Sequence, residues 1–69
     1  MNNRSDLIDV EAVFIHQTDL AIGIRIDEDS RDVIWLPKSL IEIDPPDPKR
    51  NQVCVITLSE RFAIEKRLV

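Results

Sequence analysis

The chain has 69 residues, of which 43% are apolar, and its 13 acidic and nine basic side chains give a net charge of −4. This length predicts one domain, residues 1–69, whose small core buries only about 60% of the unfolded surface, so a partner or a second copy would add stability. The net negative charge argues against a typical nucleic-acid module, which needs a basic surface to neutralise phosphates.

The sequence carries no sign of export or membrane insertion. Its one cysteine, Cys54, cannot form an internal disulfide, and the start of the chain lacks a basic region followed by an apolar one. The apolar runs reach about five residues, against the roughly 20 that a membrane-spanning helix requires. These features predict a cytoplasmic protein without a membrane partner.

The first third of the chain predicts two strands. Residues 1–6 are polar and aperiodic, which is typical of a frayed terminus. Apolar and polar residues alternate over 7–17 and, after a polar break, most regularly over 20–27. Gly23 lies inside this second strand, where a bulge, a close approach of the backbone or a small solvent-facing residue would each explain it.

The middle of the chain predicts two further strands and two connections. Residues 27–32 are rich in Asp and Ser, which bond to nearby backbone groups in turns. A third strand follows at 33–36 and ends at Pro37, which has no N–H to donate. A fourth strand is expected at 40–44. The next segment, 45–52, holds three of the four prolines and predicts an extended, semi-rigid surface loop.

The last part of the chain predicts a strand and a helix. Residues 53–58 are apolar on both faces, which favours an interior or covered strand. Ser59 is a good N-cap for a helix over 61–68, with Glu60 in its first turn. Sequential pairing of these strands predicts a mainly β fold: a small curled five-stranded antiparallel sheet, or a barrel of SH3-like or OB-like size, with a short C-terminal helix.

Two segments carry a resemblance to known proteins. Residues 35–39, Trp-Leu-Pro-Lys-Ser, and the stretch 56–68 resemble a group of small bacterial, phage and plasmid proteins with the pattern Trp-Ile-Pro-Lys-Ser, a strand, Pro-Glu-Trp, Leu-Ala and a short charged helix. This chain has Ser59, Arg61 and Arg67 where that pattern has Pro, Trp and Gly. The group has no general assigned activity, so the resemblance implies this architecture and a mobile-element origin.

Catalytic and metal chemistry find little support in the sequence. His16 and Cys54 are the only histidine and cysteine, so a Cys–His pair is the one nucleophilic arrangement available. The valines beside Cys54 favour an inert core thiol. Alternate carboxylates at 27–32 suggest calcium, but Arg31 and Lys38 occupy positions where a calcium loop requires ligands. We therefore expect no cofactor, no metal and no catalytic residue.

The candidate binding residues lie in three segments. Trp35 is either a core anchor or a binding hot spot, and its apolar neighbours favour the core. The candidates for partner contact are Trp35, Lys38, the proline loop over 45–50 and the 27–32 turn. The individual residues singled out are Trp35, Lys38, Lys49, Arg50, Asp27, Glu28 and Asp29.

Three hypotheses for function follow. The first is a non-enzymatic protein-binding module, encoded by a phage or another mobile element, that acts stoichiometrically as an inhibitor or accessory factor of a host or phage complex. The alternative is a small-barrel accessory protein that binds single-stranded nucleic acid through residues 38–69, which hold six bases and five acids. The third is an enzyme with Cys54 as nucleophile, which predicts thiol labelling of the native fold.

Overall fold

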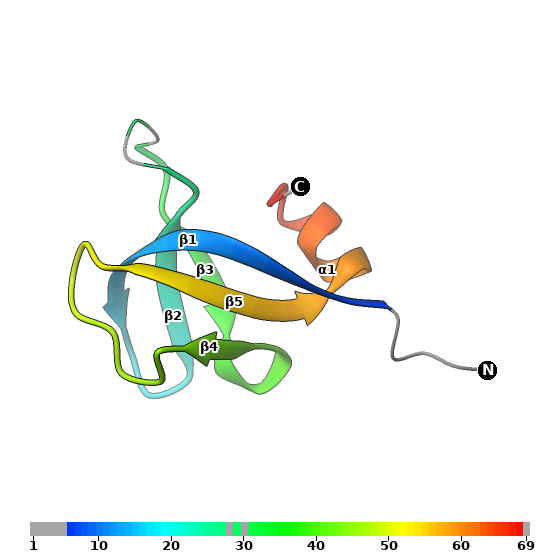
Figure 1. The fold of residues 1–69 in the computed structure, drawn as a ribbon, viewed down its shortest axis with the longest axis horizontal. Helices are drawn as coiled ribbons and strands as arrows, with labels where there is room; N and C mark the ends of the chain where they lie inside the picture. Colours follow the sequence, from blue (N-terminus) through cyan, green and yellow to red (C-terminus); the bar gives the residue numbers. More distant parts are fainter. Residues whose placement is uncertain (1–5, 28, 30, 69) are drawn as a thin grey trace.

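The computed structural model describes residues 6–27, 29 and 31–68, and in this part of the chain the strands form a single antiparallel sheet (Figure 1). The order of strands across the sheet is β3-β2-β1-β5-β4. A short 3-10 helix, η2, follows β3, and one α-helix, α1, ends the described chain. The elements are β1 (Leu7–Gln17), β2 (Ala21–Arg25), β3 (Ile34–Pro37), η2 (Lys38–Leu40), β4 (Glu42–Asp44), β5 (Val53–Ser59) and α1 (Glu60–Glu65).

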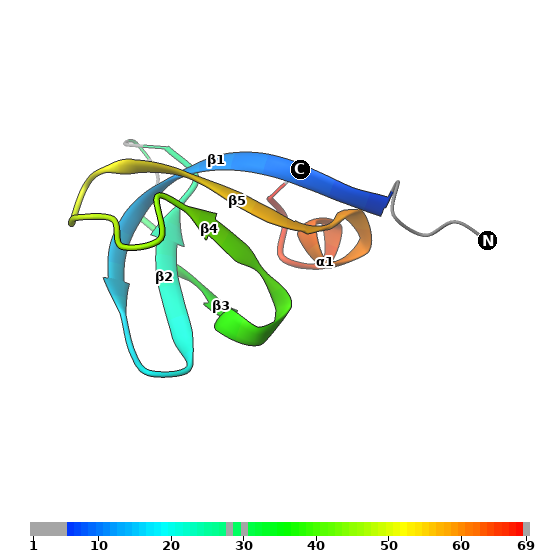
Figure 2. The same cartoon turned by 60° about the horizontal axis from the view of Figure 1, so that its bottom comes forward.

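The sheet is curled and open, as Figure 2 shows from a second direction. The predicted five-stranded antiparallel sheet with a C-terminal helix is therefore confirmed in its curled form, and the barrel alternative is not. Within the described residues, β3 pairs only with β2 and β4 pairs only with β5, so the sheet ends at these two strands. η2 connects them along the chain without joining them in a ladder.

Sequential strand pairing is confirmed for β1–β2, β2–β3 and β4–β5 but is wrong for β3–β4, because β1 pairs with β5 as well as with β2 and lies at the centre of the sheet. The β1–β5 ladder places Leu7 opposite Ser59 and Val13 opposite Val53. Period-two alternation tells which face a residue occupies but carries no information about the neighbouring strand. The interior position predicted for the fifth strand is confirmed, since β5 has a partner on each side.

A β-bulge bends β1 and gives the sheet its curl. Phe14 pairs with Ile24 and His16 pairs with Gly23, so Ile15 is the extra residue on β1. The bulge thus lies on the strand opposite Gly23. Side chains rather than a backbone approach Gly23, because a Cβ there would lie 3.0 Å from Cγ1 of Val33. Gly23 is buried, so the solvent-facing alternative is wrong.

The core lies on the inner face of the curl. One end of this face is covered by α1, which packs beneath the ends of β1 and β5 through the fully buried Ala63 (Figure 2). The buried cluster is Ala12, Phe14, Ile22, Ile24, Leu36, Cys54, Ile56, Leu58, Ala63 and Leu68.

Among the described residues, no helix is both long enough and apolar enough to cross a bilayer.

Both ends of α1 are fixed by local hydrogen bonds. The Ser59 hydroxyl accepts a hydrogen bond of 3.1 Å from the Phe62 N–H, which confirms the predicted N-cap. The helix is shorter than the predicted 61–68 because Arg67 adopts a left-handed φ of 62°. The Leu68 N–H then donates to the Ala63 carbonyl at 2.8 Å, and the Arg67 N–H to the Ile64 carbonyl at 3.0 Å. These two bonds form a Schellman motif.

Candidate functional site

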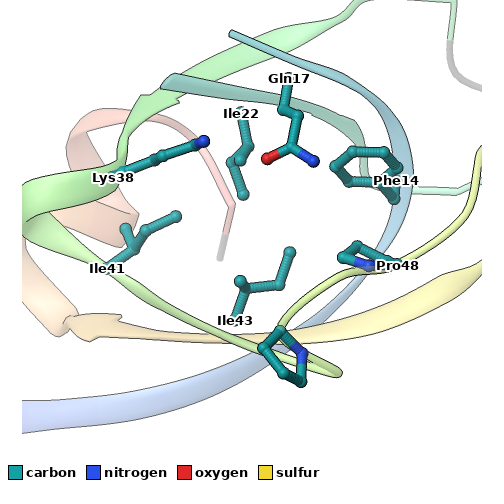
Figure 3. Close-up of a pocket in the computed structure, with 8 residues that line it drawn as sticks. Phe14, Gln17, Ile22, Lys38, Ile41, Ile43 and Pro48 are labelled. Atoms are coloured by element: carbon teal, nitrogen blue, oxygen red, sulfur yellow. The ribbon is translucent and has the colours of Figure 1, made fainter. Parts of the chain in front are cut away.

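A cavity of about 160 Å³ opens at the end of the curled sheet that lies beside the β1–β2 turn (Figure 3). Four parts of the chain form it: the inner face of β1 and β2, η2, the segment that enters β4, and the proline loop. We call it the Lys38 cavity. Its lining residues are Phe14, Gln17, Ile22, Lys38, Ile41, Ile43, Pro46 and Pro48.

The apolar wall of the cavity follows from alternation within two short segments. Ile41 and Ile43 line the cavity, while Glu42 between them is exposed. Pro46 and Pro48 also line it, and Pro48 is buried. The predicted surface loop is confirmed, since most of residues 45–52 are exposed, and one side of this loop also closes the cavity.

Hydrogen bonds to β1 hold the proline loop over the cavity. The Asn51 N–H donates to the Phe14 carbonyl at 2.7 Å, and the Phe14 N–H donates to the Gln52 carbonyl at 2.9 Å. A turn precedes this contact, in which the Gln52 N–H donates to the Lys49 carbonyl at 2.9 Å. Asn51 has a φ of 69° at the third position of the turn, a conformation that Asn tolerates better than most residues.

Two polar side chains enter the cavity from the side opposite Ile43. Figure 3 shows the Lys38 ammonium and the Gln17 amide extending into the same space. Lys38 is fixed through its backbone, because its N–H donates to the Leu20 carbonyl at 2.8 Å. Over the described part of the chain, neither side chain takes part in a hydrogen bond or an ion pair. The cavity therefore combines apolar walls with one amide and one cation that have no protein partner there.

Trp35, a predicted site residue, lies on the outer face of the sheet and is 44% exposed. The core interpretation of Trp35 was wrong because its apolar neighbours Ile34 and Leu36 face inward, and alternation directs Trp35 outward. Its ring meets the His16 ring edge to face, with the centroids 6.4 Å apart. Trp35 and the Lys38 cavity are thus on opposite faces.

The other predicted binding residues lie apart from the cavity. Lys49 and Arg50 are exposed in the turn of the proline loop. Asp27 and Asp29 are exposed between β2 and β3, at the end of these strands opposite Lys38, and the Asp29 N–H donates to Asp27 Oδ1 at 2.9 Å. This bond confirms the self-bonded turn predicted there. Glu28 lies outside the described residues, as do residues 1–5 of the predicted frayed terminus.

Apart from Lys38, the basic residues of the second half fall into two groups at opposite ends of β5. Lys49 and Arg50 precede β5, whereas Arg61, Lys66 and Arg67 follow it. A seven-residue strand separates the two groups, which corresponds to about 20 Å. Lys66 instead lies over the Phe62 ring, with Nζ 5.8 Å from the centroid.

The sheet also separates the two residues of the Cys–His hypothesis. The Cys54 side chain is 1% exposed on the inner face, and this burial raises the pKa of its thiol. His16 is exposed on the outer face beside Trp35. Within the ranges described, three or more His, Cys, Asp and Glu side chains never gather as a metal site would require.

Of the eight cavity residues, Lys38 and the two prolines of the 45–50 loop belong to the predicted contacts, and the other five do not. Alternation in 41–44 and 46–48 indicates which residues of these two segments face inward. It does not reveal that both segments close one cavity. Comparison with protein-family models, with curated proteins and with solved structures found no match to the chain.

Proposed function

We propose that the chain is a non-enzymatic protein-binding module and that the Lys38 cavity receives an apolar side chain of its partner. The cavity is the observation that carries this proposal. Its volume of about 160 Å³ is close to that of an engineered cavity of about 150 Å³ that accepts benzene. It therefore has room for one aliphatic or aromatic side chain.

The free edge of β3, next to the cavity, offers additional backbone contacts. The Lys38 N–H bonds to the Leu20 carbonyl, and the register then directs the backbone groups of Leu36 toward Ile22 on β2. The N–H and C=O of Trp35 consequently point to the unpaired side of β3. A partner strand could pair with this edge while one of its side chains occupies the cavity.

Two observations support this function over its rivals. The raised pKa and burial of Cys54 disfavour a thiolate nucleophile. The separation of Lys49 and Arg50 from Arg61, Lys66 and Arg67 disfavours a continuous groove for single-stranded nucleic acid. Phe14, one of three aromatics, is also buried. The resemblance of 35–39 and 56–68 supports a mobile-element origin and a stoichiometric role as inhibitor or accessory factor. The composition supports a cytoplasmic location.

A capture experiment with matched variants tests the proposal. The tagged chain is used as bait in a host lysate, with and without nuclease, and bound proteins are identified by mass spectrometry. Ile43→Glu places a charge in the cavity, and Val53→Glu places the same charge at a site on the outer face that is 57% exposed. We expect Ile43→Glu to lose a protein that wild type and Val53→Glu both retain after nuclease.

Two outcomes of the capture experiment would contradict the proposed function. Equal capture by a folded Ile43→Glu variant would show that the cavity is not the contact. Capture that disappears with nuclease would favour the nucleic-acid alternative. Urea unfolding of both variants shows whether each keeps the native fold, and Ile43→Ala is the substitute if Ile43→Glu does not.

A further inference from the structure

The two sides of the Lys38 cavity differ in chemistry. Ile41, Ile43 and Pro48 lie on one side, whereas the Lys38 ammonium and the Gln17 amide enter from the other, where Ile22 lies between them (Figure 3). Both polar groups can donate hydrogen bonds, and neither is used within the part of the chain that is described. Lys38 is exposed and Gln17 is half-buried, so water can accept from both groups. A ligand that displaces this water must be apolar toward Ile41 and Ile43 and offer acceptors to Lys38 and Gln17.

The charges around the cavity indicate an anionic acceptor. The chain has 13 acidic side chains, yet the cavity lining contains none. Asp44 and Asp47 belong to the segments that form the lining, but both are exposed and directed elsewhere. A lysine beside apolar walls and without a counter-ion favours an anion. A single cation with one amide suits a carboxylate better than a doubly charged phosphate, which usually gathers several cationic donors.

We propose that the cavity recognises the carboxyl-terminal residue of a partner protein, an inference that rests on the proposed function. In such a residue, the side chain and the carboxylate leave the same Cα and can reach the two sides of one small cavity. A side chain of the size of Leu, Ile or Phe enters between Ile41, Ile43 and Pro48. The carboxylate pairs with Lys38 and accepts a hydrogen bond from Gln17.

A protein terminus fits the surroundings better than a free carboxylic acid does. Lys38 follows β3 directly, so the residues before a bound terminus can continue along the free edge of that strand. The Trp35 N–H and C=O point to this edge and can pair with the backbone of the partner. A free acid would use the cavity alone, with an affinity of about 1 mM or weaker for one residue.

The test uses N-acetyl-leucine and N-acetyl-leucinamide as probes, titrated into the 15N-labelled full chain. We expect N-acetyl-leucine to shift amide resonances of Ile22, Ile41 and Ile43, and to bind about tenfold more tightly than the amide. Lys38→Met keeps the aliphatic stem but removes the charge, so it should abolish the preference for the acid. Lys49→Met removes an exposed lysine outside the cavity and should leave the preference unchanged.

The outcomes separate this inference from the proposed function. Equal binding of acid and amide at these residues would overturn the recognition of a terminus, while an apolar side chain would still occupy the cavity. Two results would contradict the cavity as a side-chain site altogether. One is a set of amide shifts confined to residues outside the cavity. The other is the absence of shifts with either probe at 20-fold its expected dissociation constant.

A longer probe distinguishes a protein terminus from a free acid. N-acetyl-Ala-Ala-Leu should bind about tenfold more tightly than N-acetyl-leucine, and it should add shifts at Trp35. Equal affinity of the two probes, with no shift along β3, would assign the cavity to a free acid and overturn the proposed terminus.

Discussion

The indole of Trp35 lies directly against Gly23, its register partner on β2. A Cβ at Gly23 would lie 3.2 Å from Cη2 and 3.3 Å from Cζ2 of the indole. The same ring meets His16 edge to face on β1. An aromatic contact across three strands therefore depends on the absence of a side chain at one position.

Gly23→Ala should lower the free energy of unfolding by about 1 kcal/mol, because the added methyl group displaces the indole and Val33. Alanine would otherwise be the better residue in a strand, by about 0.5–1 kcal/mol. In a Trp35→Ala background, the same substitution should thus be less destabilising, because only the contact with Val33 remains. Urea unfolding of wild type, Gly23→Ala, Trp35→Ala and the double variant measures the effect of Gly23→Ala in both backgrounds. An identical effect of Gly23→Ala in both backgrounds would show that the indole does not constrain position 23.

Arg67→Gly should raise the free energy of unfolding by about 1 kcal/mol. Arg67 has a φ of 62° at the C′ position of the Schellman motif, where glycine avoids the strain of a Cβ. Lys66→Gly is the matched control, since Lys66 has a φ of −92° and should gain nothing from glycine. Equal stabilisation by both substitutions would contradict the role of the left-handed conformation. Thermal unfolding of wild type and both variants measures the change in stability.

Ser59→Ala should lower the free energy of unfolding by about 1 kcal/mol, because the Phe62 N–H loses its acceptor at the start of α1. Ser59→Asp should restore most of the stability, since Asp also accepts at an N-cap. Ser39→Ala in η2 serves as the control, because η2 has no side-chain cap bond. If Ser39→Ala and Ser59→Ala were equally destabilising, capping would not be the cause.

Cys54 should resist thiol reagents in the native protein and react readily in denaturant. Its side chain is 1% exposed, and burial raises the pKa of the thiol above its ordinary value of 9.0. Labelling with a chromogenic disulfide at pH 8 measures both rates. Rapid stoichiometric labelling of the folded chain would revive the hypothesis of a cysteine nucleophile.

The same raised pKa predicts a loss of stability in alkali. Below pH 9.0 the thiol is protonated in both states, whereas above pH 9.0 it ionises in the unfolded chain first. The free energy of unfolding should therefore fall as the pH rises from 9.0 toward the native pKa. Cys54→Ala should therefore lose less stability than wild type between pH 8 and 10.5. Parallel pH profiles for the two chains would contradict a buried neutral thiol.

Local patterns in the sequence predicted local structure well. Alternation over 7–17 gave β1 its observed bounds, and the side chain of Ser59 identified the start of α1. The end of α1 was missed because Arg67 is an unusual residue for a left-handed C-cap. Trp35 was misplaced because apolar neighbours in the chain were given more weight than alternation.

The site was predicted only at Lys38 and in the loop over 45–50, and the reason is topological. Phe14, Ile22 and Ile43 each show an inward position in their own segment. Their meeting in one cavity depends on the bulge in β1 and on the pairing of β4 with β5. These are relationships between distant segments, to which periodicity along the chain is insensitive.

The central position of β1 also decides where the chain can change length. The ladder that joins Leu7 to Ser59 closes a long loop, and the entropy of such a closure grows only with the logarithm of loop length. Extra residues in the exposed turn between β2 and β3 would therefore slow assembly only slightly. Removal of β5 would instead leave β1 without one neighbour and take Ile56 and Leu58 from the core. The molecule is thus built to tolerate growth in its middle and to fail when its last strand is trimmed.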